Sequence, residues 1–203
     1  AAWGTSKMQV DNVLLEDLAE DDPFLQEFKF FESEFAGVRP FELAIEITDN
    51  HSVFDLEIQQ DIEAIGAYLK DDYGVGSLIS SAEIFSQVNR WSNGDQAQFH
   101  RLPSSQEDLQ AMIKNLNRFG ADKLLALVVH PEDKLLRISG KVSDLGAQVF
   151  RGKNEALLQW FAQNHPDSPL ELRLRGTAQL SDLNIASYSL WSLFRPGFCL
   201  SYS

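Results

Sequence analysis

The chain has 203 residues, with 17 Lys and Arg against 30 Asp and Glu, and therefore a formal net charge of −13. This charge argues against general nucleic-acid binding, because contacts to phosphate groups need clustered basic side chains. Cys199 is the only cysteine, which excludes a disulfide framework or a cysteine-based zinc site within one chain. The length allows one large domain or two small ones.

The first predicted helix begins at Pro23 and ends near Gly37. Asp21 and Asp22 precede a proline at the first helical position, where its missing N–H costs nothing. Four phenylalanines then recur at spacings of four, three and four, which places them on one helical face: Phe24, Phe28, Phe31 and Phe35. The favoured interpretation of this stripe is packing in the core. An apolar surface that binds a substrate is the rarer interpretation.

A strand with one buried face is predicted next, because the apolar residues Phe41, Leu43, Ile45 and Ile47 alternate with polar or small ones. Ser52 and Asp55 then form a cap for a helix. Five apolar residues share one face of that helix: Phe54, Ile58, Ile62, Ile65 and Leu69. A short strand is expected within residues 73–80, which completes a strand-helix-strand unit.

Two helices are predicted in the middle of the chain, each opened by a serine with a glutamate three residues later. The first follows Ser80 and stops at Asn93-Gly94, and the second follows Ser104 and stops at Gly120. Residues 124–129 are apolar throughout, which favours a central strand covered on both faces. A turn and a hairpin partner strand around residues 136–142 follow.

The last helix is predicted to be capped by Ser143 or Asp144 and to end at His165-Pro166, before an alternating strand at 170–178. This order predicts an α+β fold built from ferredoxin-like βαβ units, an open sheet with helices packed on one face. We assign residues 1–20 to a lead-in, 21–180 to the domain and 181–203 to a tail. The domain divides into βαβ halves at about 21–92 and 121–180.

We expect no catalytic residues, metal or cofactor. The four histidines, His51, His100, His130 and His165, fall in predicted turns or loops and show no second ligand at a short spacing. The sequence contains no G-x-S-x-G motif of serine hydrolases, no H-E-x-x-H motif of metalloproteases and no G-x-x-x-x-G-K-[ST] motif of P-loop proteins. Residues 74–77, Gly-Val-Gly-Ser, lack the third glycine of the dinucleotide pattern and a phosphate-binding lysine, so a tight turn is favoured there.

The longest strongly apolar run, residues 124–129, is too short to span a bilayer, and no basic region followed by an apolar one opens the chain. We therefore expect a soluble segment. Because the chain begins at Ala1 rather than at Met, the sequence favours an excised segment or a processed product of a longer protein.

Two passages resemble exporters of the resistance-nodulation-division (RND) superfamily, especially its MmpL-type lipid exporters and hopanoid exporters. The first is similar to the stretch after the first transmembrane helix and comprises residues 21–23, 30–31, 35, 37–38 and 40–42. Ala36 stands where those proteins have the first glycine of a Phe-Gly-Gly-Val-x-Pro pattern. The second passage, residues 176–184, is similar to the segment leading into the second membrane helix, and residues 139–146 extend the resemblance over most of the chain.

The resemblance implies a porter-type extracytoplasmic domain, between the first and second membrane helices, of a proton-driven exporter of hydrophobic or amphiphilic, lipid-like molecules. Its place would be the periplasmic face of the inner membrane. Its partners would be the membrane helices and second extracytoplasmic domain of the same transporter, the substrate and a periplasmic accessory protein. Residues 1–20 would follow the first membrane helix and 181–203 would lead toward the second, although Arg195-Pro196-Gly197 departs from the family's apolar helix. Phe24 and Phe28 would be substrate-binding residues near an acidic entrance.

Two alternatives compete with an exporter domain. One is a free-standing ferredoxin-like module that binds a small ligand or regulates a partner. The other is a hydrolase that uses His100 or His165 with a neighbouring carboxylate.

Overall fold

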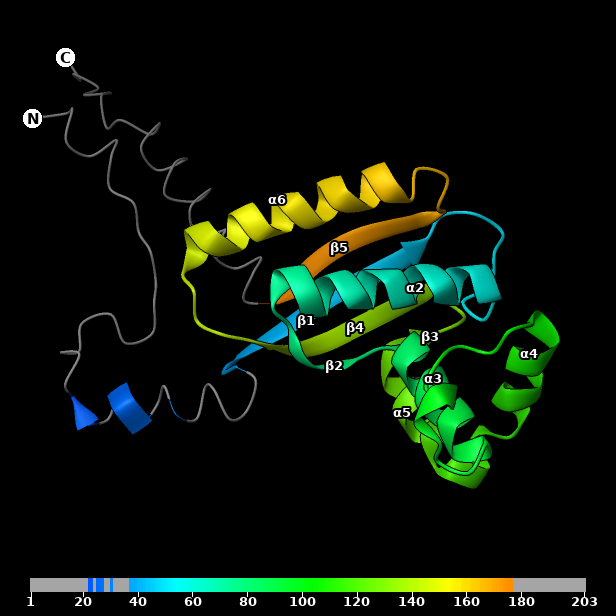
Figure 1. Ribbon diagram of the computed structural model, residues 1–203. Helices are drawn as coiled ribbons and strands as arrows, with labels where there is room; N and C mark the ends of the chain where they lie inside the picture. Colours follow the sequence, from blue (N-terminus) through cyan, green and yellow to red (C-terminus); the bar gives the residue numbers. More distant parts are fainter. Residues whose placement is uncertain (1–21, 24, 28–29, 31–36, 177–203) are drawn as a thin grey trace, which may run out of the picture.

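The computed structural model describes residues 22–23, 25–27, 30 and 37–176, and these contain one open antiparallel sheet with helices (Figure 1). The spatial order is β2-β4-β1-β5, with β3 also paired to β4. The strands are β1 (Arg39–Ile47), β2 (Gly76–Ile79), β3 (Val129–His130), β4 (Leu135–Val142) and β5 (Leu170–Gly176).

Helices fill the connections between the strands. The α-helices are α2 (Leu56–Tyr68), α3 (Ser81–Ser92), α4 (Gln106–Lys114), α5 (Ala121–Val128) and α6 (Ala147–Asn164). Three short segments join them: the π-helix η2 (Leu69–Tyr73) and the 3-10 helices η3 (Ala97–Phe99) and η4 (Leu116–Phe119). Of the helices in this described part, none combines the length and the hydrophobicity that crossing a membrane requires.

The sheet topology is that of two interleaved βαβ units. β4 pairs antiparallel with both β1 and β2, so β1 and β2 are parallel to each other and are joined through α2. β1 likewise pairs antiparallel with both β4 and β5, which are joined through α6. Each unit therefore encloses one strand of the other, and the predicted α+β fold of ferredoxin-like βαβ units is confirmed.

One face of the sheet carries the main core. Leu43 and Ile45 on β1 are fully buried, and the strand alternates buried with partly exposed residues as predicted. α2 and α6 lie over this same face (Figure 1). They contribute buried apolar residues at helical spacing: Ile58, Ile62, Ile65, Phe150, Leu157 and Phe161. Each such side chain contributes roughly 1.5–3 kcal/mol of burial free energy, so this layer stabilises the fold.

The opposite face of the sheet is charged. The guanidinium of Arg137 on β4 pairs with Glu42 on β1. Arg173 on β5 lies 2.9 Å from a carboxylate oxygen of Glu46 and 3.2 Å from one of Glu171. These alternate positions point away from α2 and α6, because successive side chains of a strand point to opposite faces.

A helical insertion, residues 80–128, interrupts one edge of the sheet. Gly76 and Ile79 of β2 pair with Lys141 and Ser139 of β4, and Val129 of β3 pairs with Leu136 further along the same strand. β2 and β3 therefore form two parts of a single edge strand, running in one direction along β4. The chain leaves this edge after β2, forms α3, α4 and α5, and returns at β3.

The prediction of a central strand at residues 124–129 is wrong. Residues 121–128 form α5, and only Val129 and His130 form a strand. Ala121, Leu125 and Val128 are buried at spacings of four and three, while Leu124 and Leu127 are exposed. The run is thus an amphipathic helix whose outer face carries leucines, and continuous hydrophobicity alone does not distinguish this from a buried strand.

Several helix starts differ from the predicted positions. Ser80 caps α3 as predicted, accepting a hydrogen bond from the Glu83 N–H at 3.1 Å. α2 begins at Leu56 with the predicted Asp55 at its N-cap position, and the Asp55 carboxylate accepts from the Ser52 N–H at 2.8 Å. α4, however, is capped by Ser105 rather than Ser104. α6 begins at Ala147 with Gly146 at its N-cap position, because the Asp144 carboxylate pairs instead with Arg39 at 2.6 Å.

The predicted phenylalanine helix is described only in part. Pro23, residues 25–27 and Phe30 are helical, and the Gln26 N–H donates to the Asp22 carbonyl at 3.1 Å. Phe30 is 60% exposed. Phe24, Phe28, Phe31 and Phe35 lie outside the described residues, as do the lead-in 1–20 and the tail 181–203. The packing of the stripe stays a prediction.

Candidate functional site

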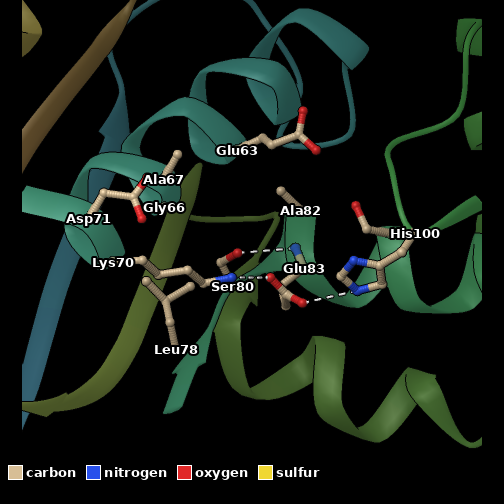
Figure 2. A pocket seen from close by; sticks show the side chains of 11 residues that line it. Glu63, Gly66, Ala67, Lys70, Asp71, Leu78, Ser80, Ala82, Glu83 and His100 are labelled. Atoms are coloured by element: carbon tan, nitrogen blue, oxygen red, sulfur yellow. Dashed lines mark hydrogen bonds and ion pairs between the residues drawn. The ribbon is translucent and has the colours of Figure 1, made fainter. Parts of the chain in front are cut away.

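A polar pocket of about 250 Å³ lies where the insertion meets α2 (Figure 2). Glu83 from α3 is central: its carboxylate lies 2.7 Å from the Lys70 ammonium and 3.2 Å from His100 Nε2. Lys70 belongs to η2 and His100 follows η3, so the three side chains join three elements. Because the Glu83 carboxylate is already engaged by Lys70 and His100 from two other elements, we assign this pocket a structural role.

Further polar side chains, buried or partly buried, connect the insertion to the α2 region. The Ser81 hydroxyl donates to Gln59 Oε1 at 2.7 Å, and Gln59 Nε2 donates to the Val53 carbonyl at 2.6 Å. Further along, Gln106 Nε2 donates to the Phe54 carbonyl at 3.0 Å, and Gln106 Oε1 accepts from the Leu56 N–H at 2.6 Å. The insertion is therefore attached to the sheet and α2 by satisfied polar contacts.

The second predicted hydrolase histidine also has a carboxylate neighbour. His165 Nδ1 lies 2.8 Å from Asp61 Oδ1, and the Ser168 hydroxyl donates to Asp61 Oδ2 at 2.5 Å. Activation of a serine requires its hydroxyl to bond the imidazole, with the carboxylate on the other ring nitrogen. Here the hydroxyl bonds the carboxylate directly, so this group closes the turn between α6 and β5 and does not form a triad.

His51 lies among carboxylates before α2. His51 Nδ1 is 2.6 Å from Asp49 Oδ2, and the ligand atoms of His51, Asp55 and Glu57 lie within 4.8 Å of one another. The Asp49 hydrogen bond raises the pKa of His51, and the His51 N–H lowers the pKa of Asp49. The expectation that no histidine has a second ligand nearby in sequence is wrong at His51. The group is open to solvent, and the absence of a metal stays a prediction.

A second cavity lies inside the insertion, and we call it the arginine–aromatic cleft. It measures about 690 Å³ and opens between the end of α3, the loop around η3, and the α4–η4 segment. Its lining combines aromatic, basic and small polar side chains: Asn89, Trp91, Ser92, Asn93, Phe99, Arg101, Pro103, Ser104, Asp108, Ala111, Met112, Asn115, Arg118 and Phe119. A volume of this order matches pockets that take small molecules, which are about 300–1,000 Å³.

Aromatic rings form the apolar part of the cleft. Trp91 is 40% exposed and stacks on Phe119, with ring centroids 6.3 Å apart and planes at 25°. Met112 and Phe99 are half-buried beside them. Aromatic rings offer a large apolar contact surface, and the flexible thioether of Met112 can change its rotamer to fit a ligand. The cleft can therefore hold hydrocarbon groups of different shapes.

Local structure explains how these residues meet. Asn93 ends α3 and Gly94 follows in a left-handed conformation, with φ at 72°, so the chain turns back along α3. The Asn89 amide donates to the Arg101 carbonyl at 2.9 Å and holds the returning loop. The N-cap of α4 at Ser105 then starts the helix that forms the second wall.

Sequence patterns did not indicate this cleft. Trp91 falls in the first predicted middle helix, and Met112 and Phe119 fall in the second, where apolar residues indicate packing. Arg101 and Arg118 belong to no motif. The sequence feature that could have indicated the cleft is a large aromatic residue near the end of each of the two predicted helices: Trp91 before Asn93-Gly94, and Phe119 before Gly120. The predicted substrate-binding residues Phe24 and Phe28 lie outside the described residues, so the structure neither joins them to the cleft nor separates them from it.

Comparison of the chain with family models, with curated proteins and with solved structures finds no match. The function proposed below therefore rests on the site and on the motif resemblance.

Proposed function

We propose that this chain is an extracytoplasmic substrate-handling and docking domain of an RND-type, proton-driven exporter of hydrophobic or amphiphilic, lipid-like molecules. The observation that carries the proposal is the arginine–aromatic cleft, where exposed aromatic rings and polar groups line one cavity. The split βαβ units support it, since the resemblance implied a porter-type domain of that construction. No catalytic step is assigned to the domain.

The cleft suits an amphiphile better than a purely polar metabolite. Trp91 and Phe119 present ring surface to solvent, and burying such surface under a ligand is favourable by roughly 25 cal/mol per Å². Asparagine and serine side chains at the rim can bond a polar head. In this proposal the cleft receives the molecule on the periplasmic side of the inner membrane, and the rest of the transporter supplies energy coupling.

The proposed partners are the membrane helices and second extracytoplasmic domain of the same transporter, and a periplasmic accessory protein. The charged sheet face of Glu42, Glu46, Arg137 and Arg173 supports docking, since α2 and α6 lie on the other side. Charged surfaces of this kind give specificity and orientation more than affinity.

Binding of a neutral apolar probe tests the proposal directly. We expect the chain to bind N-phenyl-1-naphthylamine with a rise in probe fluorescence, and Trp91→Ala to weaken that binding about tenfold, because the main stacking surface is lost. Leu127→Ala is the matched control, since Leu127 is an exposed apolar residue outside the cleft, 62% exposed on α5. Equal binding by the Trp91 variant and the parent chain would place the probe elsewhere and contradict the assignment.

The exporter context has a separate test in the complete gene. An RND-type domain between two membrane helices requires apolar segments of about 20 residues on both sides. If neither is present, the exporter assignment fails. Tight dimerisation together with binding of a polar metabolite would instead favour the free-standing ferredoxin-like module.

A further inference from the structure

We propose that the arginine–aromatic cleft selects amphiphiles with an anionic head group, such as a phosphate monoester, and that Arg101 and Arg118 bind this head group. The inference rests on the proposed function, because it names the substrate class of the same cleft. The observation behind it is the presence of two arginines in the cleft. Binding of an uncharged amphiphile would not require them.

The two cleft arginines differ from others in the structure by their lack of carboxylate partners. Arg39, Arg90, Arg137 and Arg173 each pair with at least one Asp or Glu. Within residues 37–176, no ion pair or side-chain hydrogen bond involves the guanidinium of Arg101 or of Arg118. Both side chains are exposed, so their guanidinium groups are open to a ligand, although carboxylates are abundant in a chain with a net charge of −13.

The cleft is also basic where the chain as a whole is acidic. Among the described residues, Asp108 is the only carboxylate that lines it. That carboxylate accepts the Ser105 hydroxyl at 2.8 Å, at the N-terminus of α4. Two arginines against one aspartate give the cleft a local positive charge, and the walls of a cavity focus such a field on a bound anion.

Guanidinium chemistry favours oxyanions among the ligands that could enter. Its planar set of N–H donors matches the oxygens of a carboxylate or phosphate in pairs, and charge-assisted hydrogen bonds of this kind are stronger than neutral ones. The aromatic wall of Trp91 and Phe119 lies in the same cavity and supplies the apolar contact. A molecule with an anionic head and a hydrocarbon tail therefore satisfies both parts of the lining.

The experiment uses isothermal titration calorimetry with two amphiphiles of equal chain length, dodecyl phosphate and dodecyl maltoside, each below its critical micelle concentration. Inorganic phosphate is the third titrant. We expect dodecyl phosphate to bind the full chain at least about tenfold more tightly than dodecyl maltoside, the factor that one charge-assisted hydrogen bond supplies. Inorganic phosphate should bind much more weakly than either.

Variants then locate the preference. The double variant Arg101→Gln, Arg118→Gln should reduce the preference for phosphate to within about twofold and leave dodecyl maltoside binding unchanged. The Lys pair, Arg101→Lys with Arg118→Lys, should retain an intermediate preference because charge is kept and paired geometry is lost. The double variant Lys123→Gln, Arg137→Gln is the matched control, since it also removes two positive charges, from positions that do not line the cleft. Thermal melting of every variant confirms folding.

Each result bears on the inference. Equal affinity for the two amphiphiles overturns the head-group assignment and leaves the proposed function standing. Binding of neither amphiphile overturns both. Inorganic phosphate binding as tightly as dodecyl phosphate shows a free-anion site and overturns the role of the tail. A loss of preference in the control Lys123→Gln, Arg137→Gln equal to that of the cleft double Gln variant shows a general charge effect and overturns the role of the cleft arginines.

Discussion

The ferredoxin-like part of the molecule and its helical insertion achieve order by different means. In the former, α2 and α6 cover the sheet with side chains that are fully buried, such as Ile58 and Leu157. In the insertion, Leu109 is the one buried residue of α4, and η3 buries none. α3 and α5 join the insertion to the main core through buried side chains such as Phe85, Val88 and Leu125. Polar contacts from Gln59, Gln106 and Glu83 add to this attachment. The α4 and η3 part is thus the least buried part of the insertion, and the exposed ring of Trp91 lies beside it.

Truncating the sheet core should have the largest effect on stability. Ile45→Ala is expected to cost about 4 kcal/mol of unfolding free energy, within the range for truncating a buried isoleucine, because neighbouring strands and helices enclose the side chain. Denaturant unfolding measures this change. Leu109→Ala removes an equally buried side chain from the insertion. In hydrogen exchange it should reduce protection in α4 and leave β1 protected; a matching loss in β1 would mean that the two parts unfold as one.

Removing a buried charge partner should have the next largest effect. Asp144 is 3% exposed and Arg39 is 16% exposed. Asp144→Ala should cost about 3 kcal/mol, since it leaves Arg39 without that carboxylate in a largely dry place. Glu46→Ala breaks an exposed pair with Arg173 and should cost less than about 1 kcal/mol. Thermal unfolding compares the two, and similar small losses would show that water reaches Arg39.

The helix caps of the insertion should contribute less. Ser80→Ala and Ser105→Ala each remove a side-chain acceptor from an N-terminal N–H, Glu83 in one case and Asp108 in the other. Each loss is expected to cost about 1 kcal/mol. Chemical denaturation should show the Ser80 effect in global stability, because α3 begins at the sheet edge. The Ser105 effect should be confined to the α4 segment in hydrogen exchange.

The smallest effect concerns pH. The pKa of His51 is raised, chiefly by its hydrogen bond to Asp49, so the protonated form is favoured in the fold. Its stabilisation is complete below the ordinary pKa of about 6.5 and is lost as pH rises through the raised value. The lowered pKa of Asp49 acts oppositely: its stabilisation is present above about 3.8 and is lost as pH falls. NMR titration should show the His51 pKa decreasing in Asp49→Asn; no decrease would contradict the pairing.

Sequence periodicity predicted the ferredoxin-like part and the helices α3 and α4, but it was wrong at α5, for a physical reason. A strand such as β1 must bury every second residue, and its alternation from Phe41 to Ile47 records this directly. In α5 the exposed Leu124 and Leu127 remove the polar face that would mark a helix. The cleft could not be predicted, because Trp91 and Phe119 meet only after the chain reverses at Gly94, and no local pattern encodes that contact.

The position of the insertion has a consequence for modularity. Ile79 and Val129 pair with Ser139 and Leu136 of one strand, three residues apart, which corresponds to about 10 Å along β4. A short turn can bridge that distance, so residues 80–128 meet the geometric condition for excision and for transplantation to the edge of another sheet. The arginine–aromatic cleft thus lies in a segment that is inserted between two parts of one edge strand.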